Sequence, residues 1–194
     1  MKRIAITGSM GSGKSTVSQI LRKLGHPVYD ADLIAKDVLQ SAATKIQLIE
    51  RYGIQVLNVD QSVNKQFLAS RIFNHCDDKE HLEDIIHPQV YQQLLSIDAE
   101  ELMFAEVPLL YESQGEQYFD EIWVVVSEEA ILRARLKHDR GYSDQMIDER
   151  LKHQIPQTEK IKRADVIIHN NDDIEALEAS IKKALKRYEP TSTG

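Results

Sequence analysis

The chain has 194 residues and a mass of 22.2 kDa, enough for one sizeable hydrophobic core with at most a small appended subdomain. Apolar residues make up 42% and charged residues 28%, which is typical of soluble globular proteins and excludes a disordered or fibrous chain. The net charge of -7 argues against nonspecific nucleic-acid binding, because proteins that neutralise duplex phosphates are usually basic. We therefore expect no nucleic-acid partner, and any anionic ligand must meet a local basic site.

The number of cysteines and the length of the apolar segments indicate the cellular compartment in which we expect the protein. The single cysteine, Cys76, rules out an internal disulfide and fits a reducing compartment. No apolar stretch approaches membrane-spanning length, and the short apolar run at the start does not indicate a secretory signal. We expect a cytoplasmic protein without a membrane partner, as a monomer or weak homo-oligomer.

The first thirty residues predict a strand, a glycine-rich turn and a helix. "RIAITG" is a short run with β-branched residues, typical of a buried parallel strand. Apolar residues then recur at helical spacing from Val17 to Leu24, and Gly25 stands where a helix ends. A second short strand, "HPVYD", leads into the helical "ADLIAKDVL". This alternation indicates βαβ units and a parallel sheet with helices on both faces.

The rest of the chain adds a helical middle and three further strands. Helical patterns from about residue 41 to 98 surround the turn-rich "NVDQSVN", and His87-Pro88 predicts a turn or helix break. Strands are predicted in "LMFAEVPLL", which Pro108 ends, in "EIWVVVS" and in "ADVIIHN". We therefore predict a doubly wound parallel five-stranded α/β fold, with its core at about 1–30, 100–129 and 157–188, a helical insertion at about 31–99 and a helical lid at about 130–156.

The stretch "GSMGSGKS" matches the phosphate-binding pattern G-x-x-x-x-G-K-[ST], between a predicted strand and a predicted helix. Its glycines let the backbone turn tightly and aim N–H groups inward, Lys14 brings charge to the β- and γ-phosphates, and Ser15 offers a hydroxyl to Mg²⁺. A plain glycine turn would need neither the lysine nor the Ser15-Thr16 pair. The predicted ATP-binding residues of this loop are Gly8, Gly11, Ser12, Gly13, Lys14, Ser15 and Thr16.

The sequence lacks the further motifs of two classes of protein that share this phosphate-binding loop. A GTPase would carry D-x-x-G and N-K-x-D, yet no glycine has an aspartate three residues before it, and Asn64-Lys65 is followed by Gln-Phe. A transport ATPase would need a glycine-rich signature in its middle, where Gly53 and Gly115 stand alone. A small-molecule kinase remains, with an ATP-dependent regulatory or assembly protein as the alternative from another class.

Two acidic positions are candidates for the chemistry. In "DAD", Asp32 follows the second strand at the sheet edge that carries the loop, and is a candidate base. The alternative for such an aspartate is a helix N-cap, and Asp30 and Asp32 can divide the two tasks. Glu106 lies near the end of a buried strand and either holds the water shell of Mg²⁺ or is a satisfied structural carboxylate. We expect Glu112 to be solvated.

The charged helical pair after the fourth strand contains the candidate phosphate-binding arginines. Arg135 and Arg150 lie at the edge of an apolar stripe, whereas Arg133 is expected to face solvent. Gly141, next to Arg140, separates the two predicted helices. Two charged helices joined at a glycine are typical of a hinged lid that brings guanidinium groups over phosphates. Charged helices are often only solvated faces, so which arginine contacts phosphate stays open.

In the order of its motifs the chain resembles the dephospho-coenzyme A kinase family over nearly its whole length. The resemblance rests on "ITGSMGSGKST", "VYDADLIAKDV", "FLASRIF", "LEDIIHPQVY", "EVPLLYE", "RGYSDQMIDERLKHQ" and "KIKRADVIIHNN". It implies transfer of the ATP γ-phosphate to the ribose 3′-hydroxyl of dephospho-coenzyme A, the last step of coenzyme A synthesis. A kinase for another nucleotide or small hydroxyl acceptor is the alternative.

The resemblance also implies roles for residues. Asp32 is the implied catalytic base, and the helical insertion with the "HP" and "VPLL" segments is the implied acceptor site. The acceptor-site residues on this basis are Asp30, Asp32, His87, Pro108 and Leu109. The chain departs from the family pattern at Ser9-Met10, commonly Gly-Ile, at Asp139-Arg140, commonly Arg-Asp, and at Asp172, frequently glycine.

Overall fold

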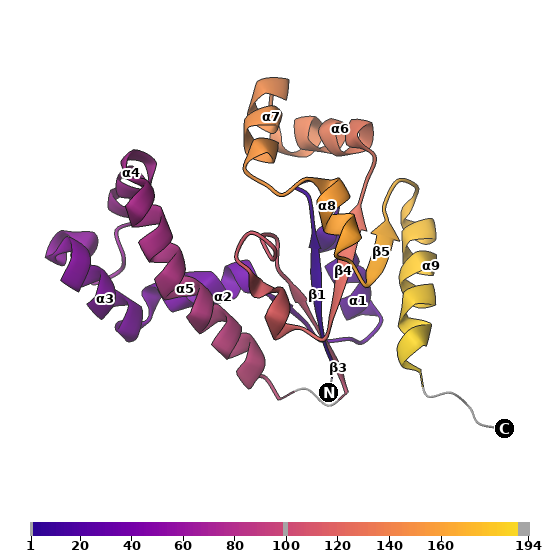
Figure 1. The fold of residues 1–194 in the computed structure, drawn as a ribbon, viewed down its shortest axis with the longest axis horizontal. Helices are drawn as coiled ribbons and strands as arrows, with labels where there is room; N and C mark the ends of the chain where they lie inside the picture. Colours follow the sequence, from indigo (N-terminus) through magenta and orange to yellow (C-terminus); the bar gives the residue numbers. More distant parts are fainter. Residues whose placement is uncertain (1, 99–100, 190–194) are drawn as a thin grey trace. The chain divides into compact units, whose positions relative to one another are not determined.

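The computed structural model describes residues 2–98 and 101–189, in two compact units. The first unit runs up to Tyr29 and resumes at Asp98, and the second is Asp30–Ile97. The first contains a five-stranded sheet in the order β2-β3-β1-β4-β5 (Figure 1). Its strands are β1 (Lys2–Gly8), β2 (Val28–Asp30), β3 (Leu102–Glu106), β4 (Glu121–Val126) and β5 (Val166–His169).

The register of the sheet brings the strand ends to one edge. β1 runs parallel to β3 and β4, with Ile6 opposite Glu106 and Gly8 opposite Val125, and β4 runs parallel to β5. In a parallel sheet the carboxyl ends of neighbouring strands open on the same side. The segments that follow β1, β3, β4 and β5 therefore start close together.

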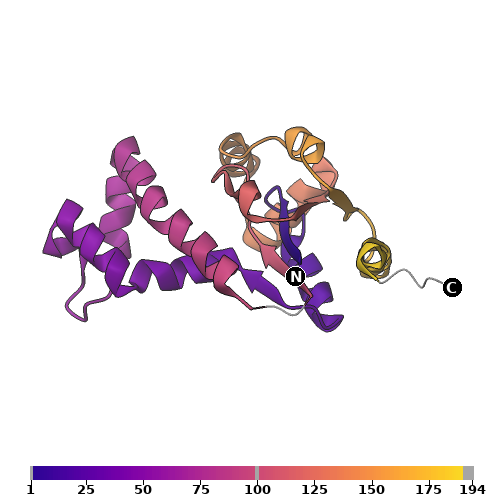
Figure 2. The same cartoon turned by 60° about the horizontal axis from the view of Figure 1, so that its bottom comes forward.

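Helices cover both faces of this sheet. On one face α1 (Lys14–Lys23) packs with α9 (Ile174–Leu185), and their apolar side chains join Ile4, Ile6 and Trp123 in one buried cluster. Alternate strand residues point to the opposite face, where α8 (Gln157–Lys162) contacts β4 (Figures 1 and 2). The predicted doubly wound parallel sheet is thus confirmed. Strand β3 ends at Glu106, just before Pro108, as the sequence predicts, because Pro108 has no N–H for a further ladder bond.

Two helices, α6 (Glu129–Arg140) and α7 (Asp144–Lys152), follow β4, and Gly141 ends α6 in a left-handed conformation with φ 64°. Leu132 and Leu136 of α6 pack with Ile147 of α7, and Met10 of the glycine-rich loop lies against this cluster. Met10, a departure from the family pattern, therefore contributes to packing between the loop and these two helices.

The polar side of this helix pair is held by ion pairs. Arg133 bonds to Glu129 and to Asp148 at 2.5 Å, and these carboxylates raise the pKa of its guanidinium. A bond from Lys137 lowers the pKa of the Asp144 carboxyl. The prediction that Arg133 faces solvent was therefore wrong, because this side chain is only 27% exposed and joins α6 to α7.

The second unit consists of α2 (Ala31–Gln40), α3 (Ala42–Tyr52), α4 (Lys65–Asn74) and α5 (Cys76–Ser96). Short 3₁₀ turns occur at Ile54–Val56 here and at Gly115–Tyr118 and Lys186–Tyr188 in the first unit. Leu48, Val56 and Ile85 belong to its buried cluster. In the described part of the chain, no helix is both long and apolar enough to cross a membrane.

The predicted helix break at His87-Pro88 was wrong, because α5 continues through Pro88. Proline removes one hydrogen bond from a helix interior and crowds the preceding turn. Ile85 and Val90, on either side of Pro88, are buried, and α5 packs against α2 and α4. This packing offsets the local cost, which the sequence pattern alone does not reveal.

Candidate active site

The glycine-rich loop between β1 and α1 has the shape of a phosphate cradle. A Cβ atom at Gly8 would lie 2.3 Å from the Val125 carbonyl oxygen, so only glycine allows the loop to approach β4. Gly13 has φ 91°, a left-handed conformation, and a Cβ there would lie 2.0 Å from Asn170 Nδ2. Both glycines are therefore required by the loop's own geometry, and a side chain at either position would distort it.

The donors of this loop suit a polyphosphate. Lys14 is buried, and its ammonium donates to the carbonyl oxygens of Gly8 at 3.0 Å and Ser9 at 3.1 Å. Helix α1 begins here without a side-chain cap, so the N–H groups of its first turn lack one of the usual protein acceptors. Ser15 is exposed in that turn, and Thr16 is half-buried. These residues fit a nucleoside triphosphate together with a magnesium ion.

Glu106 lies beside the same helix. Its Oε2 accepts a hydrogen bond from the buried Ser18 hydroxyl at 2.7 Å, and it stands opposite Ile6 in the sheet. Ser18 is one helical turn after Ser15, so the two serines share a face of α1. The carboxylate is thereby held below the turn that carries the candidate magnesium ligand.

The structure separates the three candidate arginines. Arg135 donates to the Ser127 hydroxyl at 3.0 Å and to the Asn170 carbonyl at 3.1 Å, and its Nη1 lies 3.8 Å from where a Gly13 Cβ would be. Arg140 is exposed at the end of α6, and Arg150 lies over the Tyr142 ring at 4.8 Å from its centroid. Arg135 alone of these three is tied to groups that line the loop.

Polar groups that follow β4 and β5 complete this edge of the sheet. Gln157 bonds to the backbone N–H and carbonyl of Ser127, and Gln154 accepts from the Met10 N–H at 3.0 Å. A cavity of about 550 Å³ beside the loop is lined by Ser9, Ser127, Gln154 and residues of α6 and α7. Sequence reasoning missed Ser127 and Asn170, although their positions directly after buried parallel strands were a signal.

Glu112 is not solvated as expected. Its side chain is 17% exposed and lies 3.0 Å from the ammonium of Lys160, a side chain with no exposure. Its Oε1 also accepts from the Ile155 N–H at 2.9 Å. The segment that connects α7 to α8 is thus bonded to Glu112 and, through Gln154, to the loop.

The predicted acceptor residues fall in both units. In the second unit Asp30 caps α2, accepting from the N–H groups of Asp32 at 2.9 Å and Leu33 at 3.2 Å. Asp32 is exposed in the first turn of α2, and His87 is half-buried in α5. The capping task therefore belongs to Asp30.

In the first unit, Pro108 and Leu109 follow β3. The Pro108 carbonyl accepts from the Thr7 hydroxyl at 3.4 Å, which ties this turn to β1. Leu109 is 45% exposed, an unusual position for a large apolar side chain. This segment therefore offers apolar surface beside the strand that leads into the loop.

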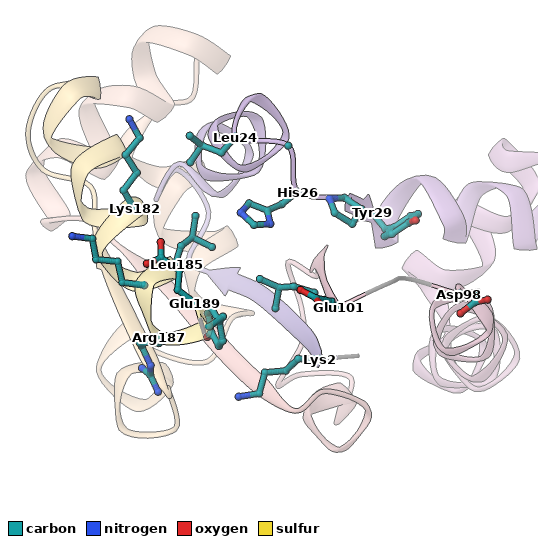
Figure 3. Close-up of a pocket in the computed structure, with 15 residues that line it drawn as sticks. Lys2, Leu24, His26, Tyr29, Asp98, Glu101, Lys182, Leu185, Arg187 and Glu189 are labelled. Carbon is teal, nitrogen blue, oxygen red and sulfur yellow. The ribbon is translucent and has the colours of Figure 1, made fainter. Parts of the chain in front are cut away.

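A larger hollow, about 1580 Å³, lies at the opposite edge of the sheet and contains none of the predicted site residues (Figure 3). It is lined by the starts of β1 and β3 and by the end of α9. Lys182 and Arg187 on one side and Asp98 and Glu101 on the other give it mixed charge, and burial lowers the pKa of His26 in its wall.

Comparisons with known proteins agree with this geometry. A model of the dephospho-CoA kinase family matches residues 2–176. A Fusobacterium nucleatum protein named dephospho-CoA kinase is 33% identical, over 93% of this chain and 95% of its own. A solved dephospho-CoA kinase from Campylobacter jejuni is 26% identical with a TM-score of 0.73, covering 95% of this chain and 96% of its own. A solved Thermus thermophilus protein is 30% identical with a TM-score of 0.82, covering 97% and 98%. The chain belongs to the dephospho-CoA kinase family.

Proposed function

We propose that the protein transfers the γ-phosphoryl group of ATP to the ribose 3′-hydroxyl of dephospho-CoA, giving CoA and ADP. The observation that carries this is the loop with Lys14 and Arg135 at one sheet edge, in a chain of the dephospho-CoA kinase family. The ribose oxygen forms the new bond to the γ-phosphorus as the bond to the β,γ-bridging oxygen breaks. ADP leaves, and the hydroxyl proton goes to a carboxylate.

At the nucleotide end, catalysis is positioning and charge stabilisation. The loop N–H groups and the first turn of α1 hold the phosphates, and Lys14 exchanges its carbonyl acceptors for phosphate oxygens. Magnesium, when bound, neutralises charge on the β- and γ-phosphates, and the Ser15 hydroxyl and the Glu106 carboxylate suit its ligand shell. Arg135, with Arg140 and Arg150 as further predicted contributors, adds positive charge.

At the acceptor end we assign the proton transfer to Asp32. Asp30 accepts from two N–H groups as the N-cap of α2, and Asp32 is exposed in the first turn of that helix, so we assign to Asp32 the orientation and deprotonation of the hydroxyl. His87, Pro108 and Leu109 are the proposed acceptor contacts, supported by the family pattern and by the exposure of Leu109. A reducing cytoplasm is the proposed location, supported by the single cysteine.

The test is the Asp32→Asn variant in an assay of dephospho-CoA-dependent ADP release. We expect kcat to fall about 10²–10⁴-fold, the range for losing a general base, with the Kd of a non-hydrolysable ATP analogue nearly unchanged. Asp37→Asn is the matched control, because Asp37 is an exposed aspartate of the same helix. Wild-type turnover in Asp32→Asn would refute the proposed role.

The acceptor is tested separately with a panel of nucleosides and small alcohols. Dephospho-CoA should stimulate ADP release far more than the other compounds. If another acceptor does so and dephospho-CoA does not, the protein is a different kinase. Hydrolysis of ATP that responds only to a protein partner would instead indicate a regulatory or assembly protein.

A further inference from the structure

A buried asparagine, Asn170, connects the phosphate loop to helix α6. It follows β5 directly, is 6% exposed, and its backbone N–H donates to the Val126 carbonyl at 2.9 Å. Its side-chain Nδ2 donates to the Ser12 carbonyl at 2.8 Å. A side chain fixed at the end of the β4–β5 ladder therefore reaches the backbone of the loop.

The bond to Ser12 sets the direction of a phosphate-binding donor. The Ser12 carbonyl and the Gly13 N–H belong to one planar trans peptide, so they point in opposite directions. Asn170 at 2.8 Å, with the Ser127 hydroxyl at 3.2 Å, draws the carbonyl to one side, so the Gly13 N–H is aimed to the other. The same Nδ2 lies 2.0 Å from where a Gly13 Cβ would be, so asparagine and glycine fit each other.

Asn170 also holds the guanidinium of Arg135. Arg135 Nη2 donates to the Asn170 carbonyl at 3.1 Å and to its Oδ1 at 3.3 Å, and Nη1 donates to the Ser127 hydroxyl at 3.0 Å. The Ser127 hydroxyl in turn lies 2.8 Å from the Asn170 carbonyl. A guanidinium has five N–H donors, so these three contacts leave it capacity to bind a phosphate.

We propose that Asn170 is a positioning residue for phosphoryl transfer, which fixes the Gly13 N–H and the Arg135 guanidinium in one geometry toward the triphosphate. The inference rests on the proposed function, since it concerns the same nucleotide site. A positioned donor stabilises charge in the transition state without reorganisation, so its loss lowers turnover more than it lowers folding stability.

The test compares Asn170→Asp and Asn170→Ala with the control Asn171→Ala. The aspartate keeps the shape and the acceptor for Arg135 but loses the donor to Ser12. Asn171 is the neighbouring asparagine, and its Oδ1 accepts from the Glu128 N–H at 2.8 Å. We expect both Asn170 variants to lose about 10–100-fold in kcat/KM, and Asn171→Ala to stay within about twofold of wild type.

A double-variant cycle separates positioning from a structural role. If Asn170 acts through Arg135, the loss in Asn170→Ala/Arg135→Ala is smaller than the product of the two single losses. Losses that multiply, or Asn170 variants as active as Asn171→Ala, would overturn the proposal. Urea unfolding followed by Trp123 fluorescence checks that each variant is folded, because Trp123 is the single tryptophan and is fully buried.

The affinity for a non-hydrolysable ATP analogue makes the result independent of the acceptor. If the wild-type protein ignores dephospho-CoA, the proposed function fails, but the Asn170 variants should still bind the analogue about tenfold more weakly. Unchanged analogue affinity in both variants would then reject the inference.

Discussion

Lys160→Met tests the buried ion pair beside the loop and the α6–α7 helices. The ammonium of Lys160 has no exposure and lies 3.0 Å from Glu112. Methionine fills a similar volume but leaves the Glu112 carboxylate with the Ile155 N–H and no opposing charge at that position. Breaking a buried pair costs roughly 3–5 kcal/mol, and the 17% exposure of Glu112 favours the lower end, about 3 kcal/mol. For a chain of this size that corresponds to a fall in Tm of about 6–12 °C.

Urea unfolding monitored by Trp123 fluorescence measures the effect in the first unit, where this tryptophan is buried in the sheet. The matched control is Lys162→Met in the same helix. Lys162 is 68% exposed and pairs with Glu159 on the surface, an interaction worth about 0–1 kcal/mol. Glu112→Gln combined with Lys160→Met should recover part of the loss, because no buried charge remains unpaired. If Lys160→Met costs no more than Lys162→Met, the reasoning is refuted.

Three further predictions concern the arginines, the metal and the acid limit of folding. Arg135→Ala should lower kcat about 10²-fold, a larger loss than that of Arg140→Ala, because Arg135 is held beside Gly13 while Arg140 is exposed. Equal losses of kcat in the two variants, measured by steady-state kinetics, would contradict this prediction. Glu106→Gln should raise the magnesium concentration that gives half-maximal ADP release, and an unchanged magnesium dependence would exclude a metal role. Burial by itself raises the pKa of Asp78, but hydrogen bonds from Arg51 and Tyr52 and nearby positive charge outweigh it, so the pKa lies below its usual value. The stability that this carboxylate contributes is present above its unfolded pKa, near 4, and is lost as the pH falls through the depressed folded value. Asp78→Asn should therefore weaken the acid dependence of unfolding seen by far-UV circular dichroism, and an unaltered dependence would show that other groups set it.

Several features were predictable because short segments determine them. The strands and most helices follow from hydrophobic periodicity, which fixes the buried face of each segment before any tertiary contact forms. The phosphate loop is also local, since its glycines, Lys14 and Ser15 lie within one turn between a strand and a helix. The resemblance to the family then indicated dephospho-CoA as the phosphoryl acceptor. Periodicity and motif spacing alone had left the identity of the acceptor open.

Features that depend on contacts between distant segments were not predictable in this way. Glu112 meets Lys160 only when the turn after β3 packs on α8, and Arg133 meets Asp148 only when α6 folds against α7. α5 continues through Pro88 because α2 and α4 pack along it. In each case a local preference was overruled by burial that neighbouring elements supply.

By itself the sequence determined the parallel α/β fold and the presence of a triphosphate-binding loop, because both follow from residues close together in the chain. The tertiary structure decided that Arg135 lies beside Gly13 and that Asn170 holds the Ser12 carbonyl. Ser12 and Asn170 are 158 positions apart, and they meet only because β1, β4 and β5 run in parallel and end at one edge of the sheet.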